Sequence, residues 1–194
     1  MKITICILFV FSICLSLQAQ TKIFKSYEEY VNGTGKTIDG NYTDWVSGTF
    51  GSLIKITKSD GKVEKIHLKE FWGFTNQGYI FRKLGFELAV LVDTGKINFW
   101  YNGMAAVRLL PSLKANVTLV GHPDEHSLCY LSVGDINAPI YKMDFLYGQK
   151  YFKRFKKDFP DYDDFYDCLE KYLLYNEVRK CVNTYNSNQR KRKR

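Results

Sequence analysis

Apolar and polar residues alternate in short runs through the middle of the chain, a pattern typical of β-strands. Runs at 53–58 and 63–68 flank the turn sequence Asp60-Gly61, and runs at 86–92 and 97–101 flank a second turn at 93–96. Asp-Gly between two such runs is a strong hairpin signal. We therefore predict two β-hairpins.

Further strand-like runs lie between and after these hairpins. The aromatic-rich segment 70–85 reads as two short strands around a turn at 76–78, and three later runs follow at 117–121, 127–133 and 140–148. Strands and helices do not alternate along the chain, so a parallel sheet is not expected. We predict an α+β fold with an antiparallel β-sheet, or a partly closed barrel or meander, of about seven to nine strands.

Two regions have helical patterns. A short N-terminal helix is expected within 24–33, with Ser26 as its N-cap and Gly33 just past its end. Near the C-terminus, 151–159 is a basic segment ended by Pro160. A long helix is predicted over 161–185, where apolar residues recur every three or four positions and acidic residues crowd the first turn.

The first twenty residues, MKITICILFVFSICLSLQAQ, have the pattern of an export signal. Lys2 precedes an apolar run from Ile3 to Leu17, and small or polar residues follow. We expect cleavage near Gln20-Thr21, an uncleaved anchor helix being the alternative. The expected organisation is a signal peptide over 1–20, one α+β domain over 21–186 and a disordered basic tail over 187–194. The exported protein would be periplasmic, on the outer surface or secreted.

The positive charge of the chain is concentrated at its C-terminus. The formal net charge is +8, and five of these charges belong to the last five residues, Arg190, Lys191, Arg192, Lys193 and Arg194. The remaining body is close to neutral, which does not support a general nucleic-acid-binding face. We interpret the tail as a solvated end, with binding to anionic surfaces as the alternative.

Three cysteines remain after the expected cleavage. Cys168 and Cys181 both fall in the predicted long helix, where thirteen residues of rise would hold them about 20 Å apart. That separation excludes a disulfide between them unless the helix breaks. The alternatives are a disulfide from Cys129 to one of them, or three reduced and buried thiols.

The segment Asn32 to Gly40 contains GTGKT, the ending of many phosphate-binding loops. Tyr30 occupies the position of the first glycine of that motif, and a predicted helix precedes the segment where a strand is required. Nucleotide binding is therefore not expected. We interpret the segment as a flexible link between the first helix and the sheet.

The segment GHPDEH places His122, Glu125 and His126 in the H-x-x-E-H order of one class of zinc peptidases. That chemistry requires a helix, which brings histidines four residues apart onto one face. Pro123 and the neighbouring strand-like runs instead favour a polar loop. A zinc site and a metal-dependent hydrolase remain the alternative.

Aromatic residues make up 16% of the chain. Trp45, Trp72 and Trp100 are the candidates for an exposed ligand-binding surface, although aromatic side chains of a β-rich domain are more often core.

Several stretches together resemble a group of uncharacterised exported proteins of Gram-negative bacteria. They are LQAQ at the end of the signal, FKSYEEYVNG, EFWGFTNQGYIFR and the late VNTYN. The resemblance implies an exported location and brings no known activity. Because no residues satisfy a catalytic arrangement, we expect a non-catalytic binding or envelope-associated protein of unknown ligand. The alternatives are the metal-dependent hydrolase and an anionic-surface-binding module acting through the basic tail.

Overall fold

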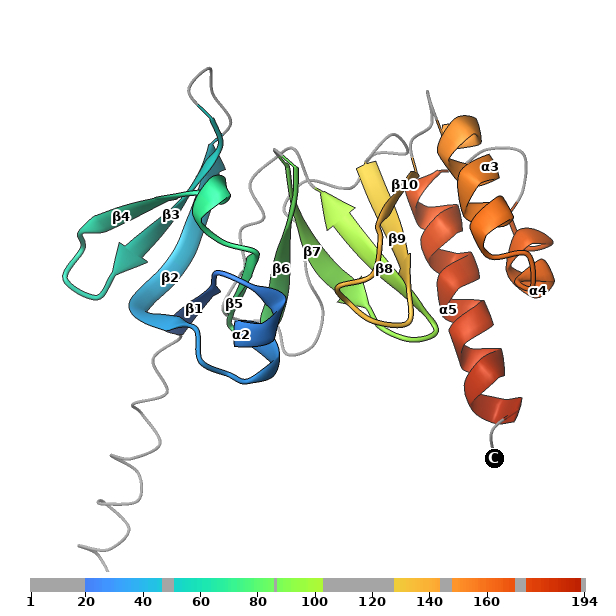
Figure 1. The fold of residues 1–194 in the computed structure, drawn as a ribbon, viewed down its shortest axis with the longest axis horizontal. Helices are drawn as coiled ribbons and strands as arrows, with labels where there is room; N and C mark the ends of the chain where they lie inside the picture. Colours follow the sequence, from blue (N-terminus) through green and yellow to red (C-terminus); the bar gives the residue numbers. More distant parts are fainter. Residues whose placement is uncertain are drawn as a thin grey trace, which may run out of the picture.

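A computed structural model describes residues 20–46, 51–85, 87–102, 128–143, 148–169 and 174–192. Within these residues the fold is α+β, as predicted, and is built on one open antiparallel sheet of ten strands (Figure 1). The strands are β1 (Gln20–Phe24), β2 (Lys36–Val46), β3 (Leu53–Lys58), β4 (Val63–His67), β5 (Gly73–Asn76), β6 (Tyr79–Leu84), β7 (Glu87–Asp93), β8 (Ile97–Asn102), β9 (Leu128–Val133) and β10 (Tyr141–Met143). The helices are α2 (Tyr27–Val31), the 3₁₀ turn η1 (Leu68–Glu70), α3 (Gly148–Asp158), α4 (Asp163–Tyr166) and α5 (Tyr175–Arg192).

The sheet consists of two meanders joined by the first strand. Its order is β10-β9-β8-β7-β6-β5-β1-β2-β3-β4, so β1 pairs with β2 on one side and β5 on the other. The predicted hairpins are confirmed as β3–β4 and β7–β8, and the predicted turn at 76–78 joins β5 to β6. The predicted N-terminal helix is α2, with Ser26 accepting a hydrogen bond from the backbone N–H of Glu29 at 3.2 Å.

The interpretation of 33–40 as a flexible link is wrong, because Lys36 begins β2. Ile38 is buried and pairs with Thr21 of β1, which lies inside the sheet. Gly40 is also buried, and a Cβ atom there would lie 2.6 Å from the carbonyl oxygen of Thr57. A glycine is therefore required at this point of β2, where it pairs with the end of β3.

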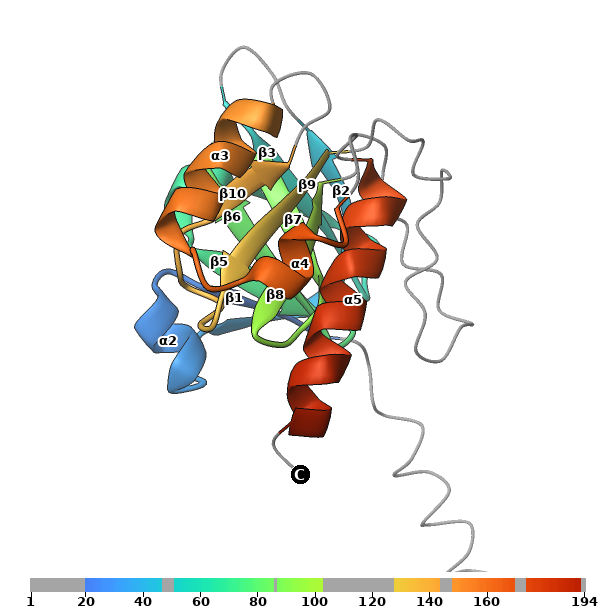
Figure 2. The same ribbon diagram turned by 90° about the vertical axis from the view of Figure 1, so that its right-hand side faces the viewer.

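One face of the sheet carries the main core. Phe74 and Phe81 stack with their ring centroids 4.5 Å apart, and Tyr42 lies 5.1 Å from each of them. Helices α3, α4 and α5 lie together at the β8–β10 end of the sheet (Figure 2). There they add Phe155 and Val178, both fully buried, to this core.

A smaller core lies on the other face of β7, β8 and β9. It contains Leu91, Trp100 and Tyr130, and the β9–β10 connection adds the partly buried Ile136 and Ile140. We call this connection the 134–140 segment. It lies against the face of the sheet, so the central strands are buried on both sides.

The guanidinium of Arg82 in β6 holds the 134–140 segment in place. It donates to the carbonyl oxygens of Ile136, Asn137 and Ala138 at 2.6, 3.1 and 2.9 Å. Burial lowers the pKa of Arg82. Five donors on a rigid planar group suit it to binding several carbonyls at once.

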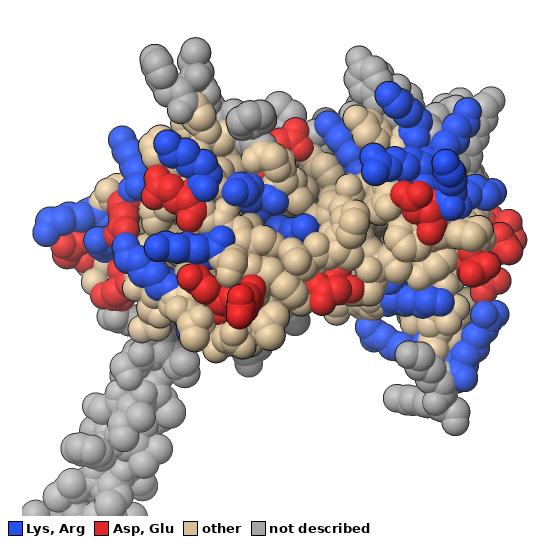
Figure 3. Space-filling view, viewed as in Figure 1, with Lys and Arg blue, Asp and Glu red and all other residues tan. Residues whose placement is uncertain are grey.

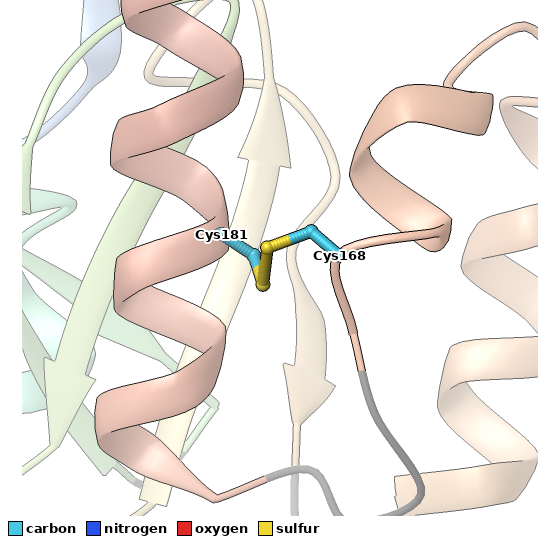
Figure 4. Close-up of a disulfide and its surroundings, with 2 residues drawn as sticks. All are labelled: Cys168 and Cys181. Atoms are coloured by element: carbon cyan, nitrogen blue, oxygen red, sulfur yellow. A yellow bond between two sulfur atoms is a disulfide. The ribbon is translucent and has the colours of Figure 1, made fainter.

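The predicted long C-terminal helix is confirmed as α5, but its predicted bounds of 161–185 are wrong. The chain forms the short α4, leaves the helix, and starts α5 at Tyr175. This break brings Cys168 and Cys181 to a Cα–Cα distance of 5.6 Å, and they form a disulfide (Figure 4). Both earlier alternatives for the thiols are therefore wrong: Cys129 is buried and outside the disulfide.

Helix α5 is also longer at its end than predicted. Residues 187–192, expected in a disordered tail, continue the helix to Arg192. Arg190 donates to the carbonyl oxygen of Thr94 at 3.1 Å, and Arg192 lies 3.1 Å from the carboxylate of Asp164. Among the described residues, no helix is long and apolar enough to cross a membrane.

Candidate functional site

The histidine motif cannot be placed in this fold. His122, Glu125 and His126 lie in 103–127, outside the described residues. In the part of the chain that is described, no three His, Cys, Asp or Glu side chains gather in a way that could hold a metal ion. The zinc site stays a prediction.

The three tryptophans occupy different environments. Trp100 is fully buried, and its Nε1 donates to the hydroxyl of Ser132 at 3.0 Å, so it belongs to the core and offers no ring to a ligand. Trp45 is half-buried and packs against the main core. Trp72 is half-buried at the surface beside α2.

Trp72 belongs to an aromatic cluster with Tyr27 and Tyr30. The ring centroids of the two tyrosines lie 5.3 and 5.4 Å from the Trp72 ring. Two polar groups of the cluster already make hydrogen bonds: the Tyr27 hydroxyl donates to Asp135 at 2.7 Å, and Trp72 Nε1 donates to Asn137 at 2.9 Å. The cluster therefore attaches α2 to the 134–140 segment.

A pocket lies between α3, β10 and the β6–β7 turn. This pocket has a volume of about 350 Å³, within the range of small-molecule sites. Its apolar walls are Leu84, Pro139, Ile140 and Tyr151. We call it the α3 pocket.

The lining of the α3 pocket includes a polar pair, the buried Tyr130 and the half-buried Glu87. The hydroxyl of Tyr130 donates to the carboxylate of Glu87 and accepts from the Asn102 amide at 3.3 Å. Burial first, and then the hydrogen bond to Glu87, raise the pKa of Tyr130. The tyrosine therefore stays protonated and keeps donating to the carboxylate across the physiological range.

The rim of the α3 pocket is cationic. Lys142 of β10 and Arg154 of α3 both line it. Arg154 is mostly exposed: its side chain retains 72% of its accessible surface, and its ion pair with Asp158 is long, at 3.8 Å.

Helix α3 extends this positive charge beyond the rim. Its exposed positions include five cations and one acid: Lys150, Lys153, Arg154, Lys156, Lys157 and Asp158. Figure 3 shows Lys and Arg side chains gathered over this helix, whereas positive and negative groups are mixed over β2, β3 and β4. The helix stays docked because Phe155 is buried and Asp158 accepts a hydrogen bond from the Tyr141 hydroxyl at 2.8 Å.

A larger pocket of about 530 Å³ lies beside β1, β2 and β4, and Lys36 of the GTGKT sequence lines it. Two of the charged side chains that line it, Lys36 and Glu64, are already paired with each other. Glu64 lies 3.1 Å from Lys36 and 2.8 Å from Lys58, and the hydrogen bonds from Lys58 and then Lys36 lower the pKa of that carboxyl. Lys36 thus binds a carboxylate of its own chain.

No protein-family model, curated protein or solved structure matches the chain. The α3 pocket was missed by sequence reasoning, which assigned a basic helix to 151–159 without placing it. The sequence signal that could have indicated the pocket is the number of basic residues in 151–159. It is larger than favourable interaction with the helix dipole at a C-terminus requires.

Proposed function

We propose that the chain is an exported, non-catalytic binding protein that holds a small amphipathic anion in the α3 pocket. Export is supported by the N-terminal signal pattern and by the Cys168–Cys181 disulfide, because disulfides persist in oxidising compartments and are rare in the cytosol. The observation that carries the ligand class is the apolar pocket with Arg154 at its rim.

The apolar walls and the cationic side chains of the pocket favour a ligand with an apolar body and an anionic group. Leu84, Ile140 and Tyr151 offer apolar area to the body of a ligand, whose burial would provide most of the affinity. Arg154 and Lys142 would face its anionic group. Glu87 is occupied by the Tyr130 hydroxyl, which limits the repulsion that this carboxylate exerts on an anion.

The basic tail is a weaker candidate for anion binding. Arg190 and Arg192 bind groups of the same chain, whereas α3 carries five exposed cations against one acid. We therefore assign the anion-binding surface to α3 rather than to the last residues.

A pair of fluorescent probes tests this function. Anilinonaphthalene sulfonate carries an anionic group on an aromatic body, and phenylnaphthylamine offers a similar body without the charge. We expect saturable binding of both, with Tyr151→Ser weakening both. Arg154→Gln should weaken the sulfonate alone by about threefold to fivefold, since an exposed ion pair contributes up to ~1 kcal/mol. Added salt should reduce the sulfonate preference.

Lys157→Gln is the matched control, because Lys157 is exposed on the same helix and does not line the pocket. Equal losses in Arg154→Gln and Lys157→Gln would assign the binding to the general charge of α3 and contradict the pocket. Absence of saturable binding of either probe would contradict the binding function itself.

A further inference from the structure

The first strand limits where the export signal can be cut. Gln20 is exposed at the start of β1, whereas the next residue, Thr21, is 0% exposed. Thr21 pairs with Ile38 of β2 on one side and with Asn76 of β5 on the other. Its hydroxyl lies 2.8 Å from the carbonyl oxygen of Gly40 and 2.9 Å from the side-chain oxygen of Asn76.

Cleavage between Gln20 and Thr21, the boundary expected from the sequence, would create an α-ammonium group on Thr21. That charge would lie inside the sheet, away from water, on a residue whose side-chain hydrogen-bond partners, the Gly40 carbonyl and the Asn76 amide, are both neutral. An unpaired charge in such a place is strongly unfavourable. The same cut would remove Gln20, which pairs with Asp39 and Gly40.

Cleavage one residue earlier avoids both costs. The new ammonium group would then belong to Gln20, which is exposed to water. The small residue Ala19 would precede the cut, as signal cleavage favours, whereas a cut after Gln20 would follow a large polar side chain.

We propose that the exported chain begins at Gln20 and that this residue becomes a pyroglutamate. The α-amino nitrogen attacks the side-chain amide carbon Cδ, forming a C–N bond while the bond from Cδ to Nε2 breaks. The departing nitrogen takes a proton and leaves as ammonia, so the product is a five-membered lactam and no oxidant or other reactant is needed. The terminal positive charge is lost.

The modification has a structural benefit. A lactam has no free amine for an aminopeptidase to recognise, so the end of β1 is protected. This end matters because β1 lies between β2 and β5, and loss of Thr21 would remove contacts to both neighbours.

The inference rests on the export that we propose, and mass spectrometry of the N-terminal peptide tests both separately. The full chain is expressed in a Gram-negative host, recovered from the periplasm or medium, and incubated at neutral pH. We expect a peptide beginning at position 20 with a mass lower than that of the glutamine form by one ammonia. Gln20→Ser should be cut at the same bond and show no such loss.

Each other result has a definite meaning. An exported protein that begins at Thr21, or one that keeps an uncyclised Gln20 after incubation, would overturn the inference and leave export intact. A protein found only with Met1 and the first twenty residues would overturn export and, with it, the inference.

Discussion

The side-chain amide of Asn186 binds both backbone polar groups of Ile97. Its oxygen accepts from the Ile97 N–H at 3.1 Å, and its nitrogen donates to the Ile97 carbonyl at 2.8 Å. Asn186 is 4% exposed and lies on α5, whereas Ile97 begins β8 and is fully buried. An asparagine of α5 therefore substitutes for a neighbouring strand at this point of the sheet.

Replacing this amide should weaken the docking of α5. Asn186→Ala leaves a buried N–H and a buried carbonyl without partners, so we expect the free energy of unfolding to fall by about 1–3 kcal/mol. Urea denaturation measures the loss. Asn183→Ala, at an exposed position of the same helix, is the control and should stay within about 0.5 kcal/mol of the parent protein.

Gly95 and Asn186 should be energetically coupled. A Cβ atom on Gly95 would lie 2.3 Å from Cγ of Asn186, so Gly95→Ala must displace the asparagine from Ile97. We expect Gly95→Ala to be destabilising alone and to cost much less in the Asn186→Ala background. A double-mutant cycle should give a coupling of at least about 0.5 kcal/mol, and strict additivity would contradict the contact.

Reduction of the disulfide should destabilise the C-terminal helices. Cys168 and Cys181 close a loop with a sequence separation of 13, for which the chain-entropy model gives about 3 kcal/mol. A Cys168→Ser/Cys181→Ser protein should therefore unfold at lower denaturant concentration than the oxidised parent. A reductant should shift the parent and leave the double variant unchanged. An equal response of the two proteins would contradict the disulfide.

The Tyr27–Asp135 hydrogen bond should be visible in a titration. The Tyr27 hydroxyl first, and the backbone N–H of Asn137 second, lower the pKa of Asp135. A depressed carboxyl pKa stabilises the fold above the unfolded pKa, and the contribution is lost as the pH falls through the folded pKa. Tyr27→Phe should move the pKa of Asp135 upward toward about 3.9, as followed by NMR. Asp60, distant in sequence and held by Lys62, should not change.

The hairpins could be predicted because their signals are local. Asp60-Gly61 marks the β3–β4 turn, and the apolar runs on either side of it are contiguous in the sequence. Strand β2 was missed because its inward positions include a glycine: Ile38 and Tyr42 flank Gly40, which is buried but supplies no apolar side chain to the pattern. Its identity as a strand depends on β1 and β3, which the local pattern does not contain.

The C-terminal break and the α3 pocket depend on contacts between distant segments. The apolar spacing through Cys168 and Val178 suits one continuous helix, and neither proline nor glycine marks its interruption. In the structure the helix is interrupted after α4, and the Cys168–Cys181 disulfide links the residues that follow α4 to α5. The pocket likewise joins residues far apart in the sequence: the sheet brings Leu84 and Tyr130 together in the smaller core, and the docking of α3 on β10 adds Arg154. The sequence shows the charge of this helix but not the apolar walls beside it.

Strand β1 is synthesised before both of its neighbours in the sheet, β2 and β5. Residues 20–24 are among the first of the folded domain to be synthesised, and in an exported chain they would cross the membrane early. Yet β1 has both partners only after residue 76 has emerged, since β5 ends there. Until then one of its edges is open to any other extended strand. We therefore expect β1 to be exposed to pairing with another extended segment until β5 has emerged.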